Sequence, residues 1–237
     1  MTWRGDAPPL LTTGDHPCPY LDDRYARTAF VDPRLPFDPA LYRRLLDAGY
    51  RRSGPYLYRP ACPGCQACQS LRIPVDAFRP RRRHRRNRRD NAQLECKLVT
   101  GGFYDTHYRL YERYVTERHP GGGMDEPTPG DYAHFLFASW CDSLCMELHE
   151  PDGGLIAVAV MDHLPGALSA VYTFYEPSLA RRGLGTHMIL RQIELAREWR
   201  YDWLYLGYWI DGCQRMDYKA EFRPHDIHTP TGWSRRP

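Results

Sequence analysis

The second half of the chain alternates short apolar segments with turns, and this order restricts its fold more than any other feature. Three segments have the pattern of strands and are separated by Gly-containing turns, at residues 144–149, 155–161 and 168–175. The turn Arg182-Gly183-Leu184-Gly185 follows, and then a helical pattern with Ile189, Ile193 and Ala196 on one face. Residues 203–208 have the pattern of a last strand. This order predicts a mixed α/β domain.

The first half contains fewer regular elements. Asp38-Pro39 begins a pattern that ends at Gly49 and predicts a short helix, because Asp fits the N-cap and Pro fits the first helical position. Residues 71–75 alternate like a strand. Hydrophobic residues make up 42% of the 237 residues, which is enough for a core in one large or two small domains. We predict two, a cysteine-containing domain at 1–95 and a second domain at 96–237.

Positive charge is concentrated in one segment. Residues 79–89 contain eight arginines and no acidic residue, whereas the whole chain has a net charge of only +3. The rest of the chain is therefore net negative, and this asymmetry indicates a polyanionic partner. Because arginines neutralise phosphates and stack on bases, we predict that Arg82, Arg83, Arg85 and Arg86 bind nucleic acid. The alternative is a solvated basic helix or linker without a partner.

The chain shows no sign of membrane insertion or export. No apolar run reaches the about 18 residues of a membrane span, and the first six residues lack the apolar stretch of a signal peptide. We therefore expect a cytoplasmic protein, with reduced thiols and no membrane association. We also expect a monomer.

Four cysteines have a spacing that suits a shared ligand. Cys62, Cys65 and Cys68 are each three residues apart, and Cys18-Pro19 supplies a fourth sulfur from the N-terminal arm. Four thiolates suit a tetrahedral Zn²⁺ or an iron–sulfur cluster, so we predict a possible metal site there. The alternative is that they are buried or free thiols in a reducing compartment. The other four cysteines lack this spacing and are expected in the core.

Three stretches together resemble a known family. They are Cys18-Pro19-Tyr20-Leu21, the basic, aromatic and cysteine-rich block at 51–68, and the run from Gly207 to Pro224. Their residues and their order are similar to those of the bacterial leucyl/arginyl-tRNA–protein transferases, closest to the aspartate/glutamate leucyltransferase branch. The resemblance implies an enzyme that moves leucine from leucyl-tRNA to the N-terminal α-amine of proteins beginning with Asp or Glu. It marks them for degradation by the N-degron pathway. It also implies that the four cysteines form a redox-sensitive metal site.

The order of elements in the second half resembles the GCN5-related N-acetyltransferases. In that fold an R-x-G-x-G turn opens a helix whose free backbone N–H groups hold a phosphate. We therefore expect such a domain at the C-terminus, beside the smaller N-terminal domain. At Arg182, Gly183 and Gly185 the bound anion would be the pyrophosphate of coenzyme A or the 3′ end of a tRNA, and the resemblance implies the tRNA.

The reaction that the resemblance implies needs no ATP, and its chemistry requires no cofactor. The aminoacyl ester is already activated, and an α-amine has a reference pKa of ~7.7–8.0, so a weak general base is sufficient. The last motif places Tyr208, Asp211, Lys219 and Arg223 close together in sequence. We predict that Asp211 and Tyr208 are catalytic, with Asp211 orienting or deprotonating the amine, and that Lys219 and Arg223 bind substrate. The alternative is a core strand followed by a charged turn.

An acceptor that begins with Asp or Glu needs a cation for its side-chain carboxylate, and arginine pairs with carboxylates through two hydrogen bonds. Arg51, Arg52, Arg72 and Arg223 are the candidates, and the sequence does not choose among them. Ser53 and Tyr56, in the same block as the first two, are expected to contact the substrate or the tRNA.

Other functions remain open at this stage. An arginyl donor, an acyl-CoA N-acyltransferase and a non-enzymatic, metal-stabilised RNA-binding module each fit part of the pattern. The sequence contains no G-x-S-x-G, P-loop or H-E-x-x-H pattern. There is therefore no reason to expect an ATP-driven mechanism or a hydrolase of those classes.

Overall fold

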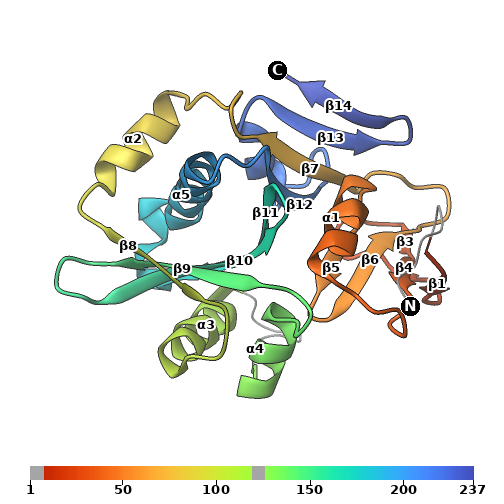
Figure 1. Cartoon of the computed structure of the whole chain (residues 1–237), viewed down its shortest axis with the longest axis horizontal. Helices are drawn as coiled ribbons and strands as arrows, with labels where there is room; N and C mark the ends of the chain where they lie inside the picture. The colour runs from red at the N-terminus through yellow and green to blue at the C-terminus, as the bar shows by residue number, and fades with distance from the viewer. Residues whose placement is uncertain (1–7, 119–125) are drawn as a thin grey trace.

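The computed structural model describes residues 8–118 and 126–237 (Figure 1). The expectation about a signal peptide concerns residues 1–6, which lie outside these ranges. The helices, including two 3₁₀ helices labelled η, are α1 (Pro39–Asp47), α2 (Arg82–Asp90), α3 (Asp105–Arg118), α4 (Pro129–Leu136), η1 (Pro177–Arg182), α5 (Leu184–Glu198) and η2 (Asp217–Glu221). No helix within the two ranges is both long and apolar enough to cross a membrane.

The strands fall into one large and two small sheets. They are β1 (Leu10–Thr12), β2 (His16–Pro17), β3 (Tyr25–Ala26), β4 (Thr28–Val31), β5 (Arg51–Ser53), β6 (Tyr56–Pro60), β7 (Gln69–Pro74), β8 (Glu95–Thr100), β9 (Ser143–His149), β10 (Leu155–Leu164), β11 (Ala167–Tyr175), β12 (Trp203–Trp209), β13 (His225–Thr229) and β14 (Gly232–Arg236). The large sheet has the order β14-β13-β7-β12-β11-β10-β9-β8. A four-stranded sheet has the order β1-β4-β6-β5, and β2 pairs with β3.

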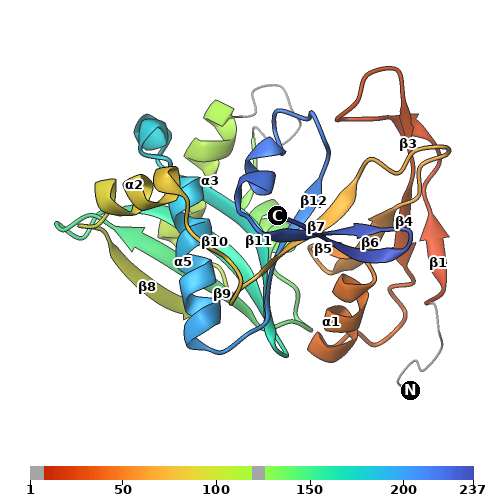
Figure 2. The same ribbon diagram turned by 90° about the horizontal axis from the view of Figure 1, so that it is seen from above.

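The centre of the large sheet has the topology that the sequence predicts. β9, β10 and β11 form an antiparallel meander, and β11 then pairs in parallel with β12. A parallel pair needs a crossover, and here it contains η1 and α5. Figures 1 and 2 show α5 running across one face of the sheet, with α3 and α4 on the other side.

The side chains of β10 account for this covering of both faces. Ala157, Ala159 and Met161 pack in the cluster that contains α5, whereas Val158 and Val160 pack with α3 and α4. All five are buried. Successive residues of a strand point to opposite faces, so a strand that is apolar at every position requires a layer on each side.

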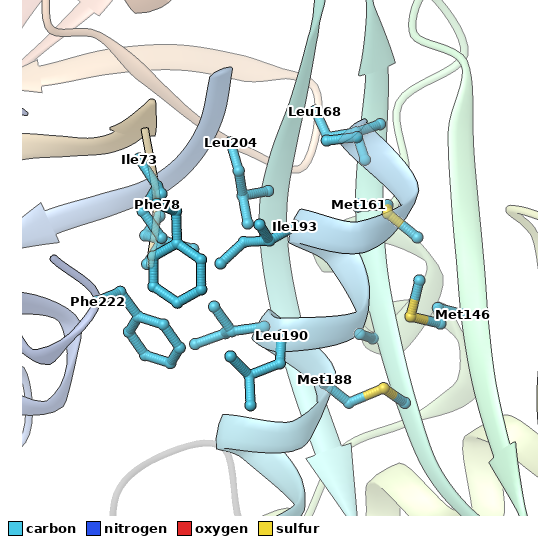
Figure 3. Close-up of a cluster of buried hydrophobic side chains, with 14 of the residues drawn as sticks. Ile73, Phe78, Met146, Met161, Leu168, Met188, Leu190, Ile193, Leu204 and Phe222 are labelled. Atoms are coloured by element: carbon cyan, nitrogen blue, oxygen red, sulfur yellow. The ribbon is translucent and has the colours of Figure 1, made fainter. Parts of the chain in front are cut away.

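Helix α5 forms the main core with the sheet (Figure 3). Met188, Leu190 and Ile193 lie between Leu204 of β12 on one side and Met161 of β10 on the other. The helix begins directly after Gly183, whose φ of 65° is left-handed and is readily adopted only by glycine. The predicted glycine turn and amphipathic helix are therefore present at these residues.

The predicted helix near residues 38–49 is α1, and its cap is the predicted one. The backbone N–H of Leu41 donates to Asp38 Oδ1 at 2.6 Å, and Pro39 is at the helix start. On its inner face, Tyr42 donates to or accepts from Ser169 Oγ of β11 at 3.2 Å. The helix therefore packs against the large sheet as well as the four-stranded one.

The large sheet crosses the predicted domain boundary at residue 95. β7, which belongs to the first part of the chain, pairs with β12 and β13 in the middle of the sheet. Its residues Leu71 and Ile73 are buried in the same cluster as α5. Two domains divided at 95 stay a prediction, but any such domains share one sheet and one core.

Candidate active site

The parallel strands β11 and β12 pair only at their beginnings. The paired residues are 167–169 of β11 and 203–205 of β12, and beyond them the two strands separate. The side chain of Arg51, from β5, occupies the gap. Its Nη2 donates to the carbonyl oxygen of Ala170 at 2.6 Å, and its Nη1 donates to Ser169 Oγ at 3.2 Å.

Gly207 of β12 makes room for this arginine. Its φ is 85°, and a Cβ atom added there would lie 3.3 Å from Nη2 of Arg51. A larger residue would therefore be strained in its backbone and crowded against the guanidinium. Gly207 therefore allows the Arg51 guanidinium to fit in the gap between β11 and β12.

A cavity of about 420 Å³ opens at this gap. Both parts of the chain line it. The first part contributes Cys18, Tyr20, Arg51, Arg52, Ser53, Tyr58, Cys62 and Cys68, and the second contributes Phe135, Val171, Leu206, Gly207, Tyr208, Met216 and Lys219. Among the described residues, no Asp or Glu lines this cavity, which we call the reaction cavity.

Two cations face the reaction cavity without an acidic partner. Within residues 8–118 and 126–237, neither Arg51 nor Lys219 forms an ion pair. The other arginines of the cavity are neutralised: Arg27 pairs with Asp15, and buried Arg52 donates from Nε to Asp162 Oδ2 at 2.7 Å. The cavity therefore carries a net positive charge that suits an anionic ligand.

Lys219 is held at the edge of the cavity by its own motif. Its Nζ donates to the carbonyl oxygen of Tyr208 at 2.7 Å. Burial, followed by the positive charge of Arg51, lowers the pKa of Lys219 to about 7, against a smaller opposite effect of Cys213. A sizeable fraction of Lys219 is therefore neutral near pH 7, and its lone pair can accept a proton.

The hydroxyl of Tyr208 is bonded within the protein, which differs from the catalytic role that we predicted for this residue. Its hydroxyl donates to the carbonyl oxygens of Gly49 and Tyr58, at 2.9 and 3.2 Å. Burial raises its pKa well above the usual range, so the phenol stays protonated. Tyr208 lines the reaction cavity, but its hydroxyl joins β12 to the four-stranded sheet.

The structure does not bring Asp211 and Arg223 into the reaction cavity. Both line a separate hollow of about 800 Å³, together with Arg81, Arg83 and Glu221. Asp211 is exposed. The site that we predicted from Tyr208 and Asp211 is therefore divided between two hollows, because β12 ends at Trp209 and the chain then turns away.

Among the arginines proposed to bind the acceptor carboxylate, Arg72 is held by contacts within the protein. Its guanidinium carbon lies 3.6 Å from the ring centre of Trp203 and 4.0 Å from that of Trp233. It also pairs with Asp47 at 2.9 Å and with Asp226 at 3.5 Å. Arg52 likewise forms an ion pair with Asp162. Of the four candidates, only Arg51 lines the reaction cavity and has no acidic partner among the described residues.

Three of the four predicted metal ligands, Cys18, Cys62 and Cys68, line the reaction cavity, and Cys65 lines a separate hollow. Burial first, and then the nearby thiols of Cys62, Cys18 and Cys65, raise the pKa of Cys68 to about 12. Cys62 Sγ accepts a hydrogen bond from the backbone N–H of Arg27 at 3.4 Å. In the part of the chain that the structure describes, no group of three or more His, Cys, Asp or Glu side chains is arranged to hold a metal ion. A metal at these cysteines stays a prediction, and no step below uses one.

The glycine turn before α5 packs against the arginine-rich helix α2. Asn87 Nδ2 donates to the carbonyl oxygens of Arg182 and Gly183, at 3.1 and 3.0 Å. A Cβ atom at Gly183 would lie 2.9 Å from that nitrogen, and Arg182 pairs with Glu150. The carbonyl oxygens of the turn are therefore bonded to α2, whereas the predicted anion would bind backbone N–H groups, and Gly185 lies in the first turn of α5.

Helix α2 presents its arginines to solvent. Its inner face consists of buried His84, half-buried Asn87 and the buried C-cap Asn91, which follow helical spacing. Arg82, Arg83, Arg85 and Arg86 are all exposed, although Arg83 pairs with Glu221. The predicted basic surface is therefore present, and the helix that carries it is held to the protein by its inner face.

The apolar lining of the reaction cavity could not be found from the sequence. Phe135, Val171 and Leu206 come from three separate elements, and none of them belongs to a motif. Met216 is the exception, because it lies in the run from Gly207 to Pro224. Of the residues that line this cavity, the sequence indicated only those in the cysteine block and in the last motif.

Two family models match consecutive parts of the chain. The model described as arginine-tRNA-protein transferase, N terminus, matches residues 16–86. The model described as arginine-tRNA-protein transferase, C terminus, matches residues 106–229.

Curated relatives match nearly the whole length. The aspartate/glutamate leucyltransferase of Alkalilimnicola ehrlichii is 50% identical over 225 residues, which cover 95% of this chain and 94% of the relative. That of Halorhodospira halophila is 51% identical over 225 residues, which cover 94% and 95%.

A solved structure shares the fold. The C-terminal domain assigned to a lysylphosphatidylglycerol synthetase of Agrobacterium fabrum has a TM-score of 0.52 and 14% identity, and the match covers 84% of this chain and 64% of that chain. At this identity the likeness shows the fold alone. The predicted mixed α/β fold, with an acyltransferase-like sheet of the GCN5-related N-acetyltransferase kind and an additional N-terminal part, is confirmed.

The arginine-tRNA-protein transferase models cover most of the chain, and two relatives identical at half of their positions match it from end to end. This chain is therefore an enzyme of the aminoacyl-tRNA–protein transferase family, as its motifs predict.

Proposed function

We propose that this enzyme transfers leucine from leucyl-tRNA to the N-terminal α-amine of proteins that begin with Asp or Glu. Both curated relatives described above carry the name aspartate/glutamate leucyltransferase. In this proposal the enzyme acts as a monomer in the cytoplasm, and the added leucine marks the acceptor for degradation by the N-degron pathway.

The observation that carries the proposal is the charge of the reaction cavity. Arg51 and Lys219 face it without acidic partners, and among the described residues no Asp or Glu lines it. A carboxylate on the acceptor's first side chain fits beside Arg51, which supports an Asp or Glu acceptor. A leucyl group fits the apolar wall of Phe135, Val171 and Leu206. Within the reaction cavity an arginyl donor would bring a third cation and meet no acid among the described residues, so this cavity favours leucine.

The chemistry is direct transfer between ester and amine. The neutral α-amine attacks the ester carbonyl carbon, the new C–N bond forms, and the C–O bond to the terminal ribose breaks. The amine nitrogen loses one proton, and the leaving 3′ oxygen gains one. Lys219 is the group in the cavity that can take the first proton, because it is partly neutral near pH 7 and is anchored on Tyr208.

Helix α2 supports a tRNA as the donor. Its exposed arginines form a positive surface that can neutralise successive phosphates.

The test is a transfer assay with leucyl-tRNA, arginyl-tRNA and acetyl-CoA against peptides beginning with Asp, Glu, Lys or Ala. We expect leucine on the Asp and Glu peptides only, and RNase treatment should abolish it. Transfer of arginine at an equal rate would overturn the donor assignment. RNase-resistant acetylation would overturn the use of tRNA.

A further inference from the structure

A second hollow, of about 590 Å³, adjoins the reaction cavity and differs from it in chemistry. Thr28, Ser53, Tyr58 and Phe135 line both, so the two hollows are direct neighbours. Among the described residues, no Lys or Arg lines the second one, and its acids are Glu126 and Asp131. We call it the aromatic hollow.

Aromatic rings form much of its wall. The ring centres of Phe30 and Tyr56 are 6.2 Å apart, those of Phe30 and Tyr58 are 6.0 Å apart, and those of Tyr56 and His134 are 6.0 Å apart. Tyr56 is 40% exposed, and its hydroxyl makes no hydrogen bond to another described residue. A large apolar ring exposed in a concave wall is suited to stacking on a flat ligand.

The wall is fixed before any ligand arrives. The backbone N–H of Gly54, in the turn between β5 and β6, donates to the carbonyl oxygen of Phe135 at 2.9 Å. A Cβ atom at Gly54 would lie 2.2 Å from the carbonyl oxygen of His134, so only glycine allows this approach. Trp140 Nε1 donates to the carbonyl oxygen of Pro55 at 3.2 Å. The hairpin that carries Tyr56 is thus fastened to α4.

We propose that the aromatic hollow binds the terminal adenine base of the donor tRNA, and this inference rests on the proposed function. In the donor, the leucyl ester is attached to the ribose that also carries this base. When the ester lies in the reaction cavity, the base must lie about one ribose away, and the aromatic hollow is next to that cavity. Stacking on Tyr56 provides binding to any flat base.

The charges favour a base over other parts of the substrates. Phosphates would be repelled by Glu126 and Asp131, which have no lysine or arginine beside them in this hollow. The exocyclic amine of adenine is a hydrogen-bond donor and is attracted to acids. Asp131 Oδ2 already accepts from the backbone N–H and the hydroxyl of Thr128, so Glu126 is the freer acceptor of the two. An apolar second side chain of the acceptor peptide is the competing occupant, and it would gain nothing from the acids.

The experiment measures binding without transfer. The ligands are a 3′-leucylamido-adenosine, whose amide does not react, and the same leucylamido-ribose without the base. We expect the wild-type enzyme to bind the adenosine compound about 10- to 100-fold more tightly, which is the range of one stacked base. Tyr56→Ala should remove most of that difference, and Tyr56→Phe, which keeps the ring, should retain it. Neither variant should change the affinity for an Asp-initiated peptide.

Equal binding of the two compounds by the wild-type enzyme would overturn the inference, and this comparison needs no variant to fold. Loss of peptide affinity in Tyr56→Ala, with the adenosine preference intact, would assign the hollow to the acceptor instead. If the enzyme failed to transfer leucine but still preferred the adenosine compound, the proposed function would fail and the base site would stand. Thermal unfolding of each variant verifies that the fold is unchanged.

Discussion

Arg51 donates a hydrogen bond of 2.6 Å to the carbonyl oxygen of Ala170, and this contact joins the four-stranded sheet to the acyltransferase-like sheet at the point where β11 and β12 separate. In that gap the backbone N–H and C=O groups of β11 and β12 no longer pair with each other. The arginine satisfies one of them and still faces the reaction cavity with its charge. The N-terminal part of the chain therefore completes the site instead of only flanking it.

The first prediction concerns acceptor selection by Arg51. Arg51→Ala should lower kcat/KM for an Asp-initiated peptide by about 100-fold or more, because a charge-assisted hydrogen bond to the substrate is lost. The preference for Asp over Asn at the first position should nearly disappear, since the carboxylate no longer meets a cation.

Arg44, which is exposed on α1 outside the cavity, provides a matched control, and Arg44→Ala should leave both values unchanged. A variant at Arg51 that is slow but still prefers Asp strongly over Asn would show that another group reads the carboxylate.

The second prediction concerns the base. Lys219→Arg keeps a positive charge but cannot become neutral, so it should retain acceptor binding and lose about 10²- to 10⁴-fold in kcat. With the wild-type enzyme, kcat/KM should rise with pH through about 7, because the neutral lysine is the active form. In the variant the rise through about 7 should vanish and leave only the rise near ~7.7–8.0 that belongs to the α-amine of the acceptor. Primary amines should partly restore the Lys219→Ala variant.

Retained activity in Lys219→Arg would mean that the lysine acts through its charge alone.

The third prediction concerns the effect of the lowered Lys219 pKa on the free energy of unfolding. The unfolded chain holds its proton on Lys219 up to about pH 10.4, whereas the folded protein releases it near pH 7. Between these values the unfolded state binds more protons, so this group makes the free energy of unfolding increase with pH. Lys219→Met should therefore stabilise the protein most at and below pH 7, and the gain should shrink toward pH 10. Urea unfolding at pH 6.5, 8 and 9.5 measures it, and a gain that is constant with pH would contradict the shift.

Local patterns predicted the elements well, because they depend on neighbouring residues. The meander of β9 to β11, the glycine turn before α5 and the Asp38 cap of α1 were all expected from sequence. The place of β7 was not expected. Its pairing with β12 joins residues more than a hundred positions apart, and no local signal encodes that.

The site was only partly predictable for the same reason. Arg51 and Arg52 are adjacent and chemically identical, yet one meets Asp162 and the other meets a carbonyl oxygen at the strand gap. Asp211 and Lys219 lie eight residues apart in one motif, but the turn after β12 sends them to different hollows. The identity of a buried partner decides such roles, and that partner is distant in sequence.

The fourth prediction tests the exclusion of Asp211 from catalysis. Since Asp211 is exposed and lines the other hollow, Asp211→Asn should keep kcat within about threefold across pH 6 to 9. The same pH series on Lys219→Arg gives the contrast. A loss of 10²-fold or more at neutral pH that diminishes as pH rises would restore Asp211 as the base.

The last prediction concerns the basic surface of α2. Arg82, Arg85 and Arg86 are exposed, and replacing all three by Gln should weaken tRNA binding and flatten its dependence on salt. Each arginine that neutralises a duplex phosphate contributes about 0.9 to the slope of log K against log salt, so the slope should fall by up to about 2.7. Arg83 is left unchanged because its ion pair with Glu221 is closer than that of Arg86, whose Nε lies 3.8 Å from Asp90 Oδ2. The control is Arg109→Gln with Arg113→Gln on α3, which removes exposed arginines that already pair with acids. If both variants change the slope equally, the effect reflects overall charge, and α2 is not a specific tRNA contact.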